Sequence, residues 1–221
     1  MVGIKKQRNY ATNNDNHTLL EEKMKQARTL NDKELNLLLL YVNTRKYAER
    51  DRCMVLMTYL AGMRIAEVAT TKIKDVLAND GTIKQEINLT AEQTKGKYPR
   101  SVVLNEKLRK EILNYLLTRF SKQQLAEGQS SAVKEKPLFN TQKSDGFNAN
   151  TACYHFHMLY KRAGLEGCSS HSGRRSFLTE LSSKSVPLKV LMELAGHRQA
   201  QTTMRYVNVT QDMKRAAVEL I

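Results

Sequence analysis

Apolar residues recur at helical spacing along most of this chain and at strand spacing in only one stretch, residues 73–104. The clearest helix signal is Asn31, which with Glu34 forms the Asn-x-x-Glu pattern of a capping box ahead of the apolar run 35–42. The strand-spaced stretch is too short to build a core sheet. The pattern therefore predicts a mainly α protein with one small, three-stranded antiparallel sheet.

Breaking and capping residues set the expected boundaries. Gly62 and Gly164 each follow an apolar helical stretch, and Pro187 stands where the first residue of a helix is expected. We expect helices over residues 31–42, 47–61, 65–70, 105–120, 148–162, 172–183, 187–194, 200–206 and 211–220. We expect strands over 73–77, 83–89 and 101–104, and a polar loop over 121–136.

The start of the chain differs in composition from the rest. Residues 1–29 are polar and include the run Asn-Asn-Asp-Asn-His at 13–17. We expect a flexible basic tail there, with a partial helix over 19–27, ahead of a single domain over 30–221.

Positive charge dominates the chain, with 36 Lys and Arg against 22 Asp and Glu and a net charge of +14. Such an excess suits a polyanion, and nucleic acid is the first candidate, although solubility alone would also account for it. Cys53, Cys153 and Cys168 suggest no disulfide framework, and the longest apolar run, 37–42, is too short to span a bilayer. We expect a soluble cytoplasmic protein associated with double-stranded DNA.

Four side chains suited to phosphate chemistry fall within residues 171–206: His171, Arg174, His197 and Tyr206. The simplest chemistry that uses all four is attack by a tyrosine hydroxyl on a phosphodiester, with the cations holding the phosphate. A phenol with a pKa of about 10 is roughly three units from ionising at neutral pH, a deficit of about 4 kcal/mol. A base and a positive field must supply that energy, and this segment offers both.

These residues resemble the C-terminal boxes of the tyrosine recombinases, the phage integrase family. The boxes are His-x-x-Arg at 171–174, the pair Gly196-His197, and Tyr206 nine residues after that histidine. The resemblance extends over roughly residues 31–221. It implies the catalytic-domain fold of the DNA breaking–rejoining enzymes.

Two further landmarks of that family occur upstream in the expected order. Residues 60–68, Leu-Ala-Gly-Met-Arg-Ile-Ala-Glu-Val, resemble its first arginine box, which places the arginine at Arg64. Residues 94–100, Thr-Lys-Gly-Lys-Tyr-Pro-Arg, resemble its β-hairpin lysine motif. The family's lysine stands just before the turn glycine, which favours Lys95 over Lys97.

The resemblance implies how the bond is broken. Tyr206 would attack the scissile phosphate and form a 3′-phosphotyrosyl bond, and Lys95 would protonate the leaving 5′ oxygen. The 5′ hydroxyl of a partner strand would then reverse the same chemistry. One phosphodiester replaces another, so we expect no ATP, no metal and no other cofactor.

The remaining catalytic candidates would serve the phosphate. Arg64 and Arg174 would hold its oxygens, because a guanidinium binds phosphate through two parallel hydrogen bonds and stays charged. Glu67 could brace Arg64. His171, expected on one helix face with Arg174, would handle a proton, and His197 would donate to the oxygen that gains charge.

Blander roles are open for the same residues. Arg64 could be a surface arginine that caps the preceding helix, and His197 could cap the C-terminus of its helix. Arg175 is expected to point away from Arg174, toward DNA or an acidic residue. The pattern Cys153-x-His155-x-His157 contains zinc-ligand types, but alternate residues on a helix face apart, so we do not expect a zinc site.

The expected function is site-specific DNA recombination. A type IB topoisomerase would use the same tyrosine chemistry without partner exchange, and a non-catalytic DNA-binding regulator would keep the charge without the tyrosine. Only 63 residues precede Arg64, so the helical DNA-clamping domain that most family members carry upstream is not expected here. Short members such as the fimbrial-switch invertases also lack it; the sequence leaves open a native short form or a truncation.

The end of the chain bears on assembly. Residues 211–221 carry a modest apolar stripe, which would either close the protein's own core or dock on a neighbouring protomer. The resemblance implies the second, with four protomers on two duplexes.

Overall fold

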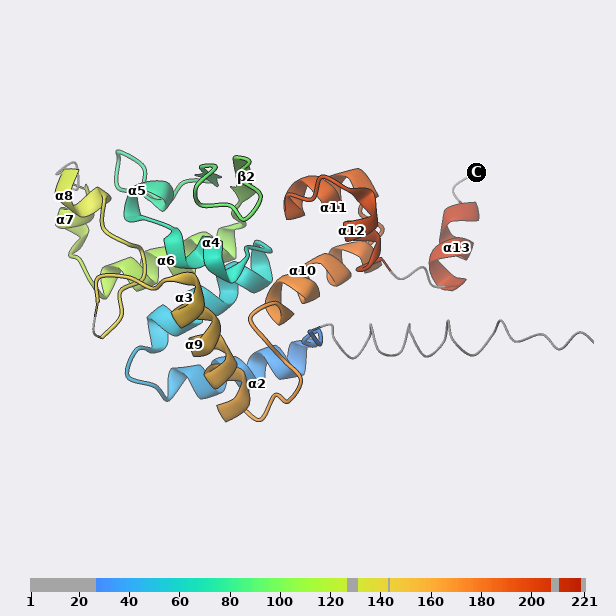
Figure 1. The fold of residues 1–221 in the computed structure, drawn as a ribbon, viewed down its shortest axis with the longest axis horizontal. Helices are drawn as coiled ribbons and strands as arrows, with labels where there is room; N and C mark the ends of the chain where they lie inside the picture. Colours follow the sequence, from blue (N-terminus) through green and yellow to red (C-terminus); the bar gives the residue numbers. More distant parts are fainter. Residues whose placement is uncertain (1–26, 127–130, 143, 208–210, 220–221) are drawn as a thin grey trace, which may run out of the picture.

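Helices make up most of the fold in a computed structural model that describes residues 27–126, 131–142, 144–207 and 211–219 (Figure 1). The helices are α2 (Asp32–Asn43), α3 (Ala48–Leu60), α4 (Ile65–Thr70), α5 (Ile73–Val76), α6 (Glu106–Leu117), α7 (Lys122–Ala126), α8 (Ser131–Lys134), α9 (Ala149–Arg162), α10 (Ser172–Ser183), α11 (Leu188–Ala195), α12 (Ala200–Met204) and α13 (Gln211–Val218). The mainly α class is confirmed.

The sheet has two strands, β1 (Glu86–Leu89) and β2 (Arg100–Val103). They pair antiparallel, with Glu86 opposite Val103 and Leu89 opposite Arg100. The prediction of a third strand over 73–77 is wrong, because this segment forms the short helix α5 and only Leu77 makes an isolated bridge, to Ile83.

Local spacing explains the error. Val76 and Leu77 follow Ile73 by three and four residues, which is the spacing of one helix face rather than of a strand. At the start of α5 the Asp75 carboxylate accepts the Lys72 backbone N–H at 2.8 Å, which caps the first turn.

The predicted helices are present with small differences at their ends. The capping box ahead of α2 is formed in both directions, with Asn31 Oδ1 accepting the Glu34 N–H and Glu34 Oε2 accepting the Asn31 N–H. The stretch 121–136 is not wholly a loop, since α7 and α8 lie within it. The partial helix expected over 19–27 and most of the expected tail lie outside the described residues.

Helix α3 runs through the middle of the core, and its buried side chains include Cys53. Burial raises the pKa of the Cys53 thiol, in keeping with a packing role. Helix α10 crosses α3 at close range because Gly173 has no side chain: a Cβ there would lie 2.3 Å from the Thr58 Oγ1. This contact brings the start of α10 against the end of α3, where the candidate site lies.

Candidate active site

The guanidinium of Arg174, in the first turn of α10, connects three parts of the chain. It is 4% exposed and donates to the carbonyl of Gly62, just after α3, and to the carbonyl of Ala195, at the end of α11, at 2.6 Å. Its Nη2 also donates to His197 Nε2 at 3.0 Å. Burial and then the neighbouring cation of Arg64 lower the pKa of Arg174, but a guanidinium remains charged in proteins.

His197 follows the left-handed residue that ends α11. Gly196 has φ +61°, and the backbone N–H of His197 donates to the Met192 carbonyl at 2.9 Å, so the backbone caps α11. The imidazole does not cap the helix. It lies between Arg174 and Thr203, with 2.9 Å from Nδ1 to the Thr203 Oγ1.

The surroundings of His197 favour its neutral form. Burial first, and then the positive charges of Arg174, Arg64 and Arg100, lower the pKa of its ring to about 4. At neutral pH this imidazole can therefore donate one hydrogen bond and accept another, as its two contacts require.

Tyr206 lies beside this imidazole, just after the C-cap residue of α12, Arg205. Its backbone N–H donates to the Thr203 carbonyl at 2.9 Å, and its ring stacks on His197 with 5.9 Å between centroids and 22° between planes. The helix expected to reach residue 206 ends at Met204. The guanidinium carbon of Arg175, a residue expected to point away from Arg174, lies 5.7 Å from the centre of the Tyr206 ring.

Arg64 is the N-cap residue of α4 and is held by Glu67. Its Nη1 donates to Glu67 Oε1 at 2.9 Å, and its backbone N–H donates to Oε2 at 2.8 Å. The bracing contact expected from the sequence is therefore present. Burial would raise the pKa of the Glu67 carboxyl, but the hydrogen bonds and charges of Arg100 and Arg64 outweigh it and lower that pKa.

Arg100 is a part of the site to which sequence reasoning gave no role. It donates to both oxygens of Glu67, at 3.2 and 2.7 Å, and to the Leu194 carbonyl at 3.0 Å. Its side chain passes so close to Gly196 that a Cβ there would lie 2.5 Å from the Arg100 Cδ. Arg100 thus joins β2, α4 and the end of α11, and with them Arg64 and the segment that carries His197.

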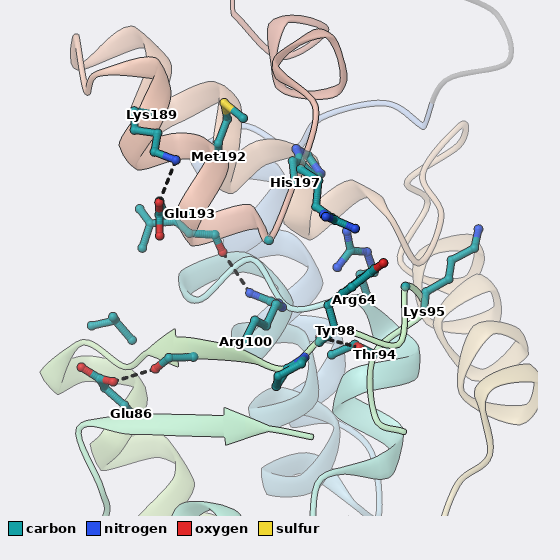
Figure 2. Close-up of a pocket in the computed structure, with 17 residues that line it drawn as sticks. Arg64, Glu86, Thr94, Lys95, Tyr98, Arg100, Lys189, Met192, Glu193 and His197 are labelled. Carbon is teal, nitrogen blue, oxygen red and sulfur yellow. Dashed lines mark hydrogen bonds and ion pairs between the residues drawn. The ribbon is translucent and has the colours of Figure 1, made fainter. Parts of the chain in front are cut away.

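The turn between β1 and β2 brings the lysine candidate to the same place. Figure 2 shows a pocket between the sheet and α11, with Arg64, Lys95, Arg100 and His197 around one end. Lys95 is exposed and extends outward from its turn, which the Thr94 hydroxyl fastens by donating to the Tyr98 carbonyl at 2.7 Å. Lys97, which has a φ of +54°, does not line this pocket.

His171 is the N-cap residue of α10 rather than part of its helical face. Together with Arg174 and Tyr206 it lines a second, smaller pocket. Its imidazole is exposed; desolvation by the protein around it, and then the charges of Arg174, Lys95 and Arg64, lower its pKa.

The structure therefore gathers all six candidates of the sequence around one centre: Arg64, Lys95, His171, Arg174, His197 and Tyr206. The group comprises three cations, two imidazoles and a phenol, and the phenol ring stacks on His197 and shares a pocket with His171 and Arg174. The buried carboxylate of Glu67 is neutralised by two arginines, so it does not repel an anion. The cluster can accept a phosphate with hydrogen-bond donors on several sides and a hydroxyl nucleophile beside it.

Two of the residues considered as zinc ligands, His155 and Cys153, contact other side chains. His155 Nε2 lies 2.9 Å from Asp51 Oδ1, and the Ser170 hydroxyl lies 3.6 Å from Cys153 Sγ. Within the described ranges no three His, Cys, Asp or Glu side chains are grouped to hold a metal ion, and no helix there is long and apolar enough to cross a membrane.

This chain belongs to the phage integrase family, whose sequence model matches residues 28–213. It is 30% identical over 171 residues to the tyrosine recombinase XerA of Thermococcus kodakarensis, covering 77% of this chain and 55% of that protein. The chain spans about half the length of the curated relatives it matches.

Solved structures share its fold. The Tn1549 transposon integrase superposes with a TM-score of 0.64 at 18% identity, over 87% of this chain and 65% of that one. The catalytic domain of bacteriophage HP1 integrase superposes with a TM-score of 0.58 at 19% identity, over 88% of this chain and 95% of that domain. The tyrosine recombinase catalytic-domain fold is thus confirmed.

Proposed function

We propose that this chain is the catalytic part of a site-specific DNA recombinase that cuts and rejoins DNA through a tyrosine. The observation that carries the proposal is the stack of Tyr206 on His197, whose Nε2 meets the buried guanidinium of Arg174. A phenol, a neutral imidazole and a fixed cation in contact are the parts that attack on a phosphodiester needs. Family membership and the +14 charge support DNA as the substrate.

The reaction follows from the placement of each group. The Tyr206 oxygen attacks the scissile phosphorus, a Tyr–O–P bond forms, and the bond to the 5′ oxygen breaks. Lys95 gives its proton to that oxygen, while Arg64 and Arg174 hold the non-bridging oxygens and His171 takes the proton of the Tyr206 hydroxyl and returns it in the reverse step. The 5′ hydroxyl of a second strand then attacks the phosphotyrosine and releases Tyr206. No ATP is needed and no metal takes part.

We place the catalytic domain at residues 30–221, acting on double-stranded DNA in the cytoplasm. The structure of the Tn1549 integrase is of a complex with transposon right end DNA, and XerA is named a tyrosine recombinase; both support this assignment. Integration, excision and inversion all use the same cleavage.

We also propose that the active form is a tetramer of this chain on two duplexes. Helix α13 supports this, because the side chains described in it are exposed except for the half-buried Met213. A helix with an apolar stripe that is not buried in its own domain is suited to a neighbouring protomer.

Trapping on a nicked suicide substrate tests the proposal. The short strand between the cleavage site and the nick, which carries the freed 5′ hydroxyl, diffuses away, so the protein stays covalently bound to the DNA. We expect this adduct to form in excess EDTA. A regulator that only binds DNA would give none. Strand exchange between two sites then separates a recombinase from a topoisomerase, which would relax a supercoiled plasmid without exchange.

A further inference from the structure

The hydroxyl of Thr203 is buried beside His197. Thr203 lies in α12, is 0% exposed, and its Oγ1 is 2.9 Å from His197 Nδ1. On the opposite edge of the ring, His197 Nε2 lies 3.0 Å from Arg174 Nη2. A guanidinium can only donate, so Nε2 must accept and the ring hydrogen must be on Nδ1. Nδ1 then donates to the Thr203 hydroxyl.

This arrangement conflicts with the role of His197 in the reaction. To stabilise a phosphate oxygen that gains charge, the imidazole must offer a hydrogen from Nε2, the edge that faces Arg174 and the site. In the protein without DNA that edge carries a lone pair. When a phosphate replaces His197 Nε2 as the acceptor of the hydrogen bond from Arg174 Nη2, the ring can move its hydrogen from Nδ1 to Nε2. The ring neither gains nor loses a proton overall.

A hydroxyl is the one small side-chain group that can serve both forms of the ring. It accepts from Nδ1–H, and after rotation about its C–O bond it donates to a bare Nδ1. A methyl in its place would leave Nδ1 unpaired in either form. The Thr203 carbonyl also accepts the N–H of Tyr206 at 2.9 Å, which keeps the stacked nucleophile in register with the ring.

We propose that Thr203 is a positioning residue for His197, which accepts from Nδ1 in the free protein and donates to it when Nε2 faces the phosphate. This inference rests on the proposed function, since it assigns His197 a donor role in cleavage. Thr203 touches neither the phosphate nor the nucleophile oxygen in this account. It acts only through the imidazole.

The first test compares two neighbouring threonines of α12. Thr203→Val removes the buried hydroxyl and leaves the backbone carbonyl, whereas Thr202→Val makes the same change at an exposed position. We expect Thr203→Val to slow single-turnover cleavage of a suicide substrate about tenfold to a hundredfold, the size of loss found when the hydrogen-bond partner of a metal-ligating histidine is removed. Thr202→Val should cleave at the wild-type rate, and Thr203→Ser should recover most of the loss. DNA affinity should be equal in all four proteins.

A double-mutant cycle separates positioning from a general packing effect. In a His197→Ala background, Thr203→Val should cause no further loss of rate, because the group through which it acts is gone. An equal loss in both backgrounds would overturn the inference. Ring-nitrogen NMR of free wild-type protein gives a reading that does not depend on activity: we expect the His197 hydrogen on Nδ1, and a hydrogen on Nε2 at neutral pH would contradict the proposal.

The two proposals can fail separately. Normal adduct formation by wild type together with an undiminished rate in Thr203→Val would overturn the role of Thr203 and leave the proposed function intact. Absence of any adduct with wild type would overturn the proposed function and this inference with it.

Discussion

Replacing Arg100 with leucine should cost both stability and cleavage, because Arg100 forms the buried ion pair that braces the site. Glu67 and Arg100 have side chains 1% and 9% exposed and share two hydrogen bonds. Removing one partner of a buried pair typically costs about 3–5 kcal/mol. Since Glu67 keeps Arg64 as a second partner, we expect the lower end, about 3 kcal/mol, which for a domain of this size lowers the melting temperature by roughly 6–12 °C.

The matched control is a second arginine–carboxylate pair joined by two hydrogen bonds, Arg52 with Glu111, outside the site. Arg52 donates to both oxygens of Glu111, at 2.9 and 2.8 Å, but these side chains are 27% and 16% exposed. Arg52→Leu should cost at most about 1 kcal/mol and leave the cleavage rate unchanged. The assays are urea unfolding and adduct formation at a temperature where each protein is folded. Equal losses of stability in the two variants, or normal cleavage by Arg100→Leu, would refute the reasoning.

Acid should remove the difference in unfolding free energy between wild type and Arg100→Leu. The pKa of Glu67 in the folded protein is lower than its ordinary value of 4.5. A carboxyl with a depressed pKa contributes stability that is present above its unfolded pKa and is lost as pH falls through its folded pKa. The gap between the two unfolding free energies should therefore be constant above about pH 5 and narrow below about pH 4.5. A gap that widens in acid would contradict the assignment.

Further predictions concern a histidine, a lysine and the last helix. The His197 ring should titrate near pH 4 by NMR in the free protein, so stability linked to its neutral form is complete above about pH 6.5 and declines in acid; titration near pH 6.5 would contradict its placement. Lys95→Ala should slow cleavage by roughly 10²–10⁴ and be rescued by a 5′-bridging sulfur, whose thiolate leaves without a proton, whereas Lys97→Ala should do neither. Deleting residues 211–221 should leave the melting temperature and DNA binding nearly unchanged but abolish strand exchange; a large drop in melting temperature would assign this helix to its own core.

The helices could be predicted because their ends are encoded locally. Asn31 and Glu34 form the capping box expected from their spacing, and Gly62 and Gly164 adopt the positive φ expected of residues that end helices. The sheet has two strands rather than the three expected, and the reason is also local. Residues 73–77 adjoin a strand-like stretch, but their apolar spacing is that of a helix, and they form α5.

The site was predictable where residue type and order carry the chemistry, and not where tertiary contacts do. The residue types and spacing from His171 to Tyr206 are enough to predict the cluster. Arg100 and Thr203 have no local signal, because each matters through a partner in another element: Glu67 is 33 residues from Arg100, and Thr203, in α12, meets His197 in the segment that follows α11.

The most direct test of the account is the covalent adduct formed by Tyr206. Tyr206→Phe keeps the ring that stacks on His197 and removes only the hydroxyl, so DNA affinity, which is largely electrostatic, should stay close to wild type. On a nicked suicide substrate, wild type should form a 3′-linked adduct whose tryptic peptide contains Tyr206, and Tyr206→Phe should form none. An adduct that persists in Tyr206→Phe, linked to another residue, would contradict the assignment of the nucleophile and the mechanism built on it.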